Sequence, residues 1–156
     1  MRARIAASIV LAAGVVLGTS GCSLFADQST TMHYDASDGV STNVGSLDVR
    51  NAIVISDNGE TGNLVVTIVN NDNDRHILTV DWDSGSSRVP VDANSITKVG
   101  VPDSVSVIMD NIRTQPGAVM PIYFQYGEAT GKELLVPVLT NQLPEYADLA
   151  PAEVEQ

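Results

Sequence analysis

The sequence predicts an all-β fold, a single Greek-key β-sandwich or barrel of about eight short strands. Between residues 47 and 138, short runs rich in valine, isoleucine and leucine alternate with turns rich in glycine, asparagine, aspartate and proline. β-Branched side chains suit a pleated sheet better than a helix. No window shows the 3.6-residue periodicity of an amphipathic helix. We therefore place one β domain at residues 47–140.

Each predicted strand has its own signal. Leu47–Ile55 first alternates and then becomes continuously apolar, as a strand does on entering a core. Pro90 cannot donate a backbone hydrogen bond, so its strand is expected at a sheet edge. The glycines at 127 and 131 bracket a hairpin turn. The predicted strands cover Leu47–Ile55, Leu64–Val69, Ile77–Trp82, Val89–Val91, Ile96–Val101, Val105–Met109, Val119–Tyr126 and Glu133–Val138.

The first 21 residues have the layout of a secretory signal peptide. Two arginines precede an apolar run from Ile5 to Leu17, and small residues follow up to Cys22. The segment resembles a bacterial lipoprotein signal, although Thr19 stands where leucine is usual. That resemblance implies lipid attachment at Cys22, which would become the mature N-terminus. The alternatives are an ordinary signal peptide or a short transmembrane helix, but a span needs about 20 apolar residues.

Two polar segments flank the predicted domain. Residues 22–46 are small and polar, and we expect a lipidated, flexible tether because they offer little apolar area to bury. Alternatively, Ser41 to Val44 forms a first edge strand. Residues 141–156 form an acidic, proline-punctuated tail, which could lay Tyr146 or Leu149 on the sandwich before fraying.

The charge of the mature chain limits its partners. After cleavage, 6 Lys+Arg face 19 Asp+Glu, so the net charge is 6 − 19 = −13. Such a surface repels nucleic acid and anionic headgroups. Membrane attachment is still possible, because acyl chains contribute about 0.8 kcal/mol per buried CH₂. Cys22 is the only cysteine, which excludes intramolecular disulfides and any other thiol nucleophile.

Two short motifs match known sites in part. Asn70–Asp74 has the D-x-D spacing of a calcium loop, but Ile77 and Asp83 occupy the positions that need glycine and a bidentate acid. We interpret it as a turn capped by its own side chains. Ser95–Lys98 matches S-x-x-K, but in a strand residues three apart point to opposite faces. Its companion S-D-N and K-T-G elements are also missing.

The sequence offers little material for catalysis. Only His33 and His76 could serve a Ser-His-Asp triad, and the nucleophile motif G-x-S-x-G is absent. We predict no enzyme activity, no catalytic residues, no cofactor and no metal site. Trp82, between Asp81 and Asp83, is expected to be a core or rim residue rather than a stacking platform.

The domain resembles the PCu(A)C copper-chaperone family of periplasmic β-sandwich proteins. The residues that carry the resemblance are Val49–Ala52, Leu64–Asn71, Gly117–Ile122 and Leu134–Val138. With its signal, Tyr34–Val40 and Leu143–Leu149, the chain is also similar to actinobacterial lipoproteins of the mycobacterial LpqE type. The resemblance implies an immunoglobulin- or cupredoxin-like sandwich outside the cytoplasm.

The copper ligands of that family do not carry over. Val105 and Val107 stand where the family's H-x-M element would place histidine and methionine. Met109 and Met120 are expected to be core residues. We therefore predict a non-catalytic interaction module, anchored through Cys22 to the extracytoplasmic face of the cell membrane, with a possible cell-envelope protein partner. The alternative is a metallochaperone using Met32 and His33. The oligomeric state stays open.

Overall fold

The computed structural model describes Ile5 and residues 37–151. Internal contacts divide the chain into two units, Met1–Tyr34 and Asp35–Gln156, and all strands belong to the second. Apart from Ile5, the predicted signal peptide lies outside the described residues, as does Cys22. Within the described part of the chain, no helix is long and apolar enough to cross a bilayer.

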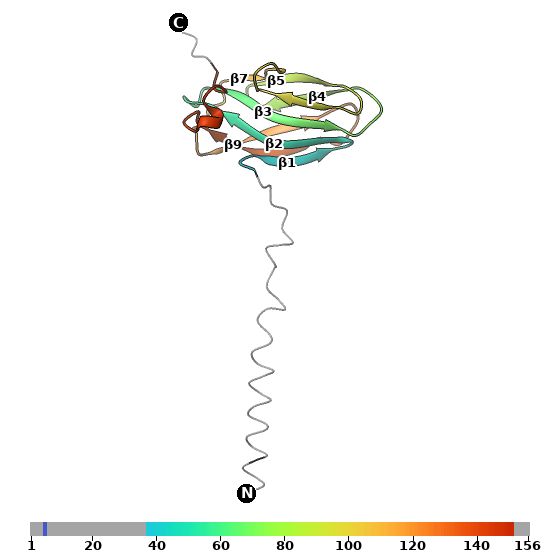
Figure 1. The fold of residues 1–156 in the computed structure, drawn as a ribbon, viewed down its shortest axis with the longest axis horizontal. Coiled ribbons are helices and arrows are strands. Elements are labelled where there is room, and N and C mark those ends of the chain that lie inside the picture. Colours follow the sequence, from blue (N-terminus) through green and yellow to red (C-terminus); the bar gives the residue numbers. More distant parts are fainter. Residues whose placement is uncertain (1–4, 6–36, 152–156) are drawn as a thin grey trace. The chain divides into compact units, whose positions relative to one another are not determined.

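Nine strands and one short helix form the domain (Figure 1). The strands are β1 Val40–Val44, β2 Leu47–Ile55, β3 Thr61–Asn70, β4 His76–Trp82, β5 Gly85–Val91, β6 Ile96–Val99, β7 Ile108–Asp110, β8 Val119–Gln125 and β9 Lys132–Leu139. The helix is a 3₁₀ turn, η2, at Pro144–Tyr146. The all-β prediction is confirmed.

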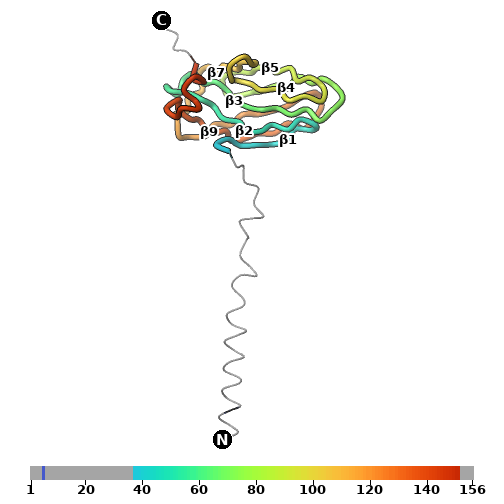
Figure 2. The backbone as a smooth tube through the Cα atoms, viewed as in Figure 1, coloured from blue at the N-terminus to red at the C-terminus, as the bar shows by residue number. Residues whose placement is uncertain are grey.

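The strands are joined in the order β5-β4-β8-β9-β2-β3-β6, with β1 paired to β2 and β7 to β3. All these pairs are antiparallel except β2–β9, where Val54 and Ile55 lie parallel to Val138 and Leu139. β9 thus links the β4–β5–β8 layer to the β1–β2–β3–β6–β7 layer. Figure 2 shows β1 and β2 on one side of the domain and β4 and β5 on the other. The result is a sandwich that is nearly closed into a barrel.

The core lies between these layers. It is made of alternate side chains from both, among them Leu64 and Ile68 of β3, Leu78 of β4 and Phe124 of β8, all fully buried. Their burial is the main favourable term in folding, since each large apolar side chain contributes about 1.5–3 kcal/mol. β5 is a terminal strand, so the edge position predicted from Pro90 is confirmed.

The predicted boundary between tether and domain at residue 46/47 is wrong. Residues Val40–Val44 form β1, the strand considered as the alternative, and pair with β2. Val44 is fully buried, and Arg50 Nη1 donates to Thr42 O at 2.9 Å and to Asn43 Oδ1 at 2.6 Å. The segment is too polar to fold alone, but the edge of β2 supplies backbone partners that its composition does not reveal.

A bulge in β2 gives this strand two buried faces. Asn51 has φ +52°, and the register with β3 shifts between Arg50 and Ile53. Beyond the bulge, Ile53 pairs with Val65 and Ile55 with Asn63. Ile53 and Ile55 are fully buried yet lie outside the inter-layer core. They therefore pack on the outer face of the β2–β3 sheet.

The C-terminal segment returns to this part of the domain. Asn63 Nδ2 donates to Leu149 O at 2.8 Å, and Asn141 N donates to Asp57 Oδ1 at 3.1 Å. The Tyr146 hydroxyl donates to Asp38 Oδ2 at 2.6 Å. Figure 1 shows the segment in red beside the end of β2. The expected contact with the sandwich is thus made by Leu149, through its backbone carbonyl on Asn63 of β3, whereas Tyr146 bonds to Asp38 just before β1.

Candidate functional site

Three residues singled out from the sequence cannot be placed in the fold. Cys22, Met32 and His33 lie outside the described residues. The site is therefore built from the residues of the domain.

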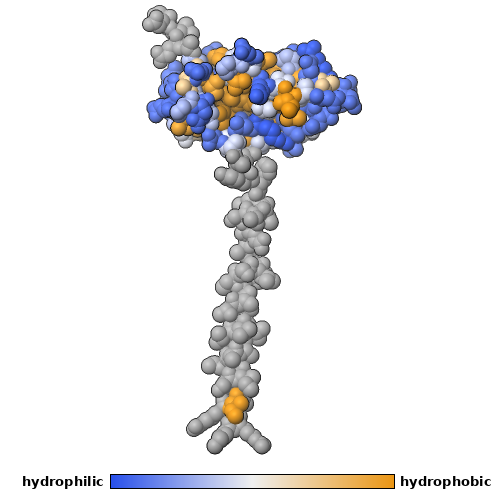
Figure 3. Space-filling view, in the orientation of Figure 1, coloured by the Kyte–Doolittle hydropathy of each residue, from blue (hydrophilic) through white to orange (hydrophobic). Residues whose placement is uncertain are grey.

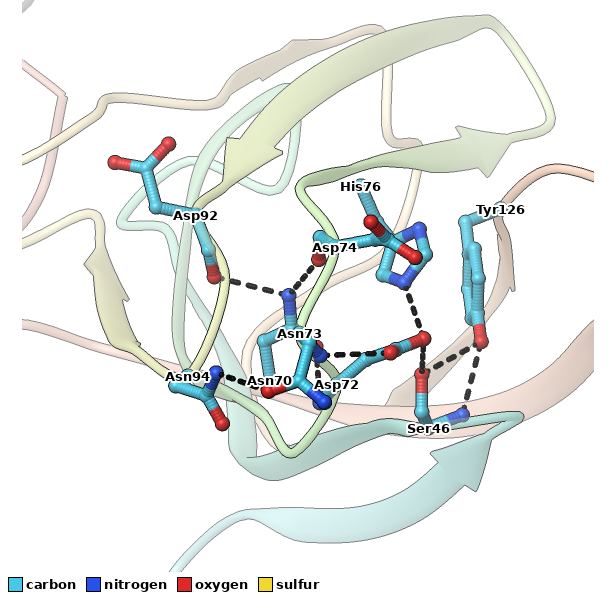
Figure 4. A network of polar contacts seen from close by, with 9 residues as sticks. All are labelled: Ser46, Asn70, Asp72, Asn73, Asp74, His76, Asp92, Asn94 and Tyr126. Carbon is cyan, nitrogen blue, oxygen red and sulfur yellow. Dashed lines mark hydrogen bonds and ion pairs between the residues drawn. The ribbon is translucent and has the colours of Figure 1, made fainter.

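One end of the domain carries a polar end cluster, drawn in Figure 4. Its residues come from the β1–β2 turn, the end of β3, the β3–β4 and β5–β6 loops, the start of β4 and the residue after β8. The members are Ser46, Asn70, Asp72, Asn73, Asp74, His76, Asp92, Asn94 and Tyr126.

The predicted turn at Asn70–Asp74 is confirmed. Asn70 Oδ1 accepts from the Asp72 backbone N–H at 2.9 Å, and Asp72 Oδ1 accepts from Asn73 N–H at 2.7 Å. Asn70 Nδ2 also donates to the carbonyls of Asp74 and Asp92, at 2.8 and 2.9 Å. Asn70 is buried, and these bonds use both its donors and its acceptor. The side chains thus serve their own backbone.

Asp72 connects the β3–β4 loop to its neighbours. Its Oδ2 lies 3.0 Å from His76 Nε2 and accepts from Ser46 Oγ at 3.3 Å. The hydrogen bond from His76, followed by that from the Asn73 backbone, holds the pKa of the Asp72 carboxyl below its usual value. The His76 ring packs on Tyr126 with centroids 4.4 Å apart, and the Tyr126 hydroxyl lies 2.9 Å from Ser46 Oγ.

This arrangement contains serine, histidine and aspartate, but not in the order that acyl transfer needs. A triad places the imidazole between the hydroxyl and the carboxylate, so that one ring nitrogen takes the serine proton. Here the Asp72 carboxylate stands between Ser46 and His76. Ser46 therefore faces a carboxylate instead of an imidazole base, and we interpret the cluster as a brace for four loops.

The serine–lysine match does not form a pair either. Ser95 Oγ donates to the Asp92 carbonyl at 2.7 Å, while Lys98 is an exposed residue of β6. Ser95 lies in the loop before β6 rather than in the strand, which differs from the expectation that the whole tetrapeptide is a strand.

The described residues do not fit the copper chemistry of the resembling family. Met109 and Met120 are buried in the core, as predicted. His76 Nε2 is already engaged by Asp72. Across residues 37–151, no three His, Cys, Asp or Glu side chains are grouped to hold a metal ion. The soft Cu(I) donors among the described residues are therefore either buried in the core, as the two methionines are, or already hydrogen-bonded, as His76 is.

The outer face of β8 and β9 carries an exposed apolar strip. Val119 pairs with Pro137 and Pro121 with Leu135, so these four side chains form adjacent rows. Val119 and Leu135 are 54% and 57% exposed, which is unusual for aliphatic residues in the middle of a layer. Because the inward residues Met120 and Ile122 are also apolar, β8 has apolar side chains on both faces.

The strip ends in a small hollow of about 260 Å³. Its walls come from the end of β4, the β4–β5 turn, β8 and β9. The lining residues are Asp81, Trp82, Asp83, Pro121, Tyr123 and Glu133. Trp82 is half-buried against the core, as expected for a rim residue, and its Nε1 donates to Asp110 O at 3.3 Å.

The sequence did not reveal the strip or the hollow. Their signal is present in β8, where Val119 to Phe124 is apolar at every position. Such a run indicates that both faces of a strand are apolar, but not whether the protein itself covers the second face. The cross-strand neighbours of Trp82 also depend on pairing that sequence alone does not give.

A second apolar area lies on the opposite layer, over β3 and β7 in Figure 3. Exposed aliphatic side chains of this layer include Ile96 on β6 and Ile108 on β7, and an open groove lies beside Ile96. The groove is lined by Ile96, Thr97, Lys98, Val101, Pro102, Asp103, Ser104 and Val105. Five of these eight residues come from the loop after β6 rather than from strands.

No protein-family model matches the sequence, and a search of curated proteins finds no match. Solved structures do share the fold. The apo PCuAC domain from PmoF1 has a TM-score of 0.54 at 12% identity, covering 65% of this chain and 99% of that domain. The copper-bound PCuAC domain from PmoF2 has a TM-score of 0.52 at 10% identity, covering 65% and 98%. At such identities the likeness is one of fold, and the described domain has a PCuAC-like fold.

Proposed function

We propose that the chain is a lipid-anchored, non-catalytic interaction module of the LpqE-type lipoprotein group, held at the extracytoplasmic face of the cell membrane. The observation that carries the binding role is the apolar strip of β8–β9. Contiguous exposed apolar patches often mark protein–protein interaction sites. The side chains of the polar end cluster hold the surrounding loops together, and we do not assign them a binding or catalytic role.

The anchor follows from the signal-like segment and Cys22. An acidic domain has no electrostatic affinity for anionic lipid, so acyl chains are needed for firm attachment. Mass spectrometry of the membrane fraction tests this. We expect a mature protein that begins at Cys22 and carries acyl mass, and an unmodified Cys22 terminus would refute the anchor.

The binding role is tested by photo-crosslinking from the strip. A photoreactive residue at Leu135 is expected to give one discrete adduct in intact cells, and the same residue at Glu128, in the β8–β9 turn, is expected to give none. Val119→Asp should abolish the Leu135 adduct, because a charge in the strip is costly to desolvate. Equal labelling from both positions, or an adduct insensitive to Val119→Asp, contradicts the proposal.

A second candidate is a copper-binding role. It is favoured by the shared fold, since one similar structure is described as a copper-bound PCuAC domain. The described donors do not fit copper, so the ligands would be Met32 and His33. Titration of the mature chain carrying Cys22→Ser with Cu(I) decides this. Sub-micromolar binding that is lost in Met32→Leu/His33→Ala would favour the copper role over the interaction module.

A further inference from the structure

The hollow beside Trp82 has a regular construction. Asp81 on β4 pairs with Tyr123 on β8, which pairs in turn with Glu133 on β9. A phenol ring therefore lies between two carboxylates across three adjacent strands. Trp82 and Asp83 follow directly along the chain and complete the rim.

Each of the two aromatic rings packs against a glycine, Trp82 against Gly85 and Tyr123 against Gly131. A Cβ at Gly85 would lie 2.8 Å from Cζ2 of Trp82, and one at Gly131 would lie 2.6 Å from Cε1 of Tyr123. Any larger residue would displace the rings. Tyr123 is nevertheless 39% exposed, so its ring is both held in place and open to a ligand. Such preorganisation lowers the entropy cost of binding.

The charges around the rings have no cationic partner within the described chain. The ion pairs found there are Arg50–Asp48 and Arg75–Asp92, and the His76–Asp72 contact is an ion pair only when the imidazole is protonated. None of them includes a residue of the hollow. The three carboxylates are also not grouped closely enough to hold a metal ion. Aromatic faces with spaced carboxylates instead suit a large, delocalised cation such as guanidinium, which stacks on rings and donates hydrogen bonds to carboxylates at its edges.

We propose that the hollow binds an arginine side chain of a protein partner, whose neighbouring apolar residues lie along the strip. Pro121 lines the hollow and also belongs to the strip, so one extended segment can reach both. This inference rests on the proposed interaction role and adds the chemistry of the partner. The negative net charge of the chain and the unpaired carboxylates make a basic segment the complementary occupant.

The test uses the mature chain with Cys22→Ser and a capped Val-Arg-Val peptide. Trp82 is the only tryptophan, so its fluorescence reports directly on the hollow. At about 0.15 M ionic strength, where long-range attraction is largely screened, we expect saturable binding. A Val-citrulline-Val peptide, which keeps the shape but lacks the charge, should bind about tenfold more weakly. Equal binding of the two peptides overturns the inference.

Variants separate the hollow from general attraction to an acidic protein. Glu133→Gln and Tyr123→Leu should each weaken the arginine peptide severalfold, while Glu128→Gln, with the same charge change as Glu133→Gln, should not. If Glu128→Gln weakens binding as much as Glu133→Gln, only overall charge is at work and the site is refuted. Arginine amide binding as tightly as the peptide would refute the extended segment.

The outcomes also distinguish this inference from the proposed function. A Leu135 adduct in cells without binding of the arginine peptide leaves the interaction role standing and removes the arginine site. Peptide binding without any Leu135 adduct removes the interaction role of the strip and leaves the hollow as an arginine-binding site.

Discussion

At the scale of single residues, Asp72 has the densest set of contacts in the polar end cluster. Both carboxylate oxygens accept hydrogen bonds, one from Asn73 and the other from His76 and Ser46. The turn around it was predictable, because asparagine and aspartate cap their own backbone. Its partners Ser46 and His76 were not, because they come from other loops that meet only in the folded domain.

We predict that Asp72→Asn lowers the urea midpoint of unfolding at neutral pH, because the amide removes the charge that His76 and the Asn73 N–H stabilise. A carboxyl with a lowered folded pKa contributes stability above its unfolded pKa, about 3.9, and loses it as the pH falls through the folded value. The gap between wild type and variant should therefore close below about pH 4. Asp74→Asn is the matched control, since only its backbone carbonyl is used. A gap that persists in acid contradicts this account.

Tyr146 offers a prediction at the opposite end of the pH scale. Its hydroxyl donates to Asp38, and that bond, together with burial, raises the pKa of the phenol to about 12. The protonated phenol is favoured by folding, so this contribution is complete below the unfolded pKa of about 10 and is lost as the pH rises towards 12. Absorbance titration of wild type minus Tyr146→Phe should show one phenol with a midpoint near 12. Asp38→Asn should move that midpoint towards 10; an unmoved midpoint would count against the pairing.

At the scale of elements, the turn after β6 depends on a glycine. Gly100 has φ +76°, and an added Cβ would clash with the carbonyl oxygen of Leu64. Gly117 has φ +92°, but a Cβ added there would meet no atom within 4 Å. We expect Gly117→Ala to cost about 1–2 kcal/mol of unfolding free energy, from the left-handed backbone alone. Gly100→Ala should cost clearly more, because backbone of β3 must move. Equal costs in chemical denaturation would show that the turn is free to shift.

The elements also show what sequence could and could not predict. The edge position of β5 followed from Pro90, and the β8–β9 hairpin followed from its glycine-bracketed turn. The continuously apolar end of β2 was recognised as a strand entering a core, but not as one buried on two faces. β1 was only an alternative, and the parallel β2–β9 contact was not predicted. Both depend on pairing between distant segments, which overrides local composition.

At the scale of the whole molecule, two surfaces have different proposed roles, one structural and one in binding. The polar end cluster connects four loops through hydrogen bonds that include the side chains of Ser46, Asn70 and Asp72. The β8–β9 strip and the Trp82 hollow leave apolar and acidic groups unsatisfied on a rigid layer. A site of this kind is visible only when strands are paired, which explains why sequence reasoning reached the fold but assigned no residue in the domain to binding.

The last prediction concerns the C-terminal segment and its contribution to the free energy of unfolding of the domain. Ile53, Ile55 and Asn63 share the outer face of β2–β3, and Asn63 donates to Leu149 O. We infer that residues 141–151 cover the two isoleucines. Ending the chain at Thr140 would expose them and remove one partner of Asn63, whose Oδ1 already has no hydrogen bond among the described residues. The expected loss is about 2–5 kcal/mol, measured by urea denaturation. Deleting only residues 152–156 removes none of these contacts and should leave the midpoint unchanged. If both truncations behave alike, the cover on Ile53 and Ile55 must come from elsewhere in the domain.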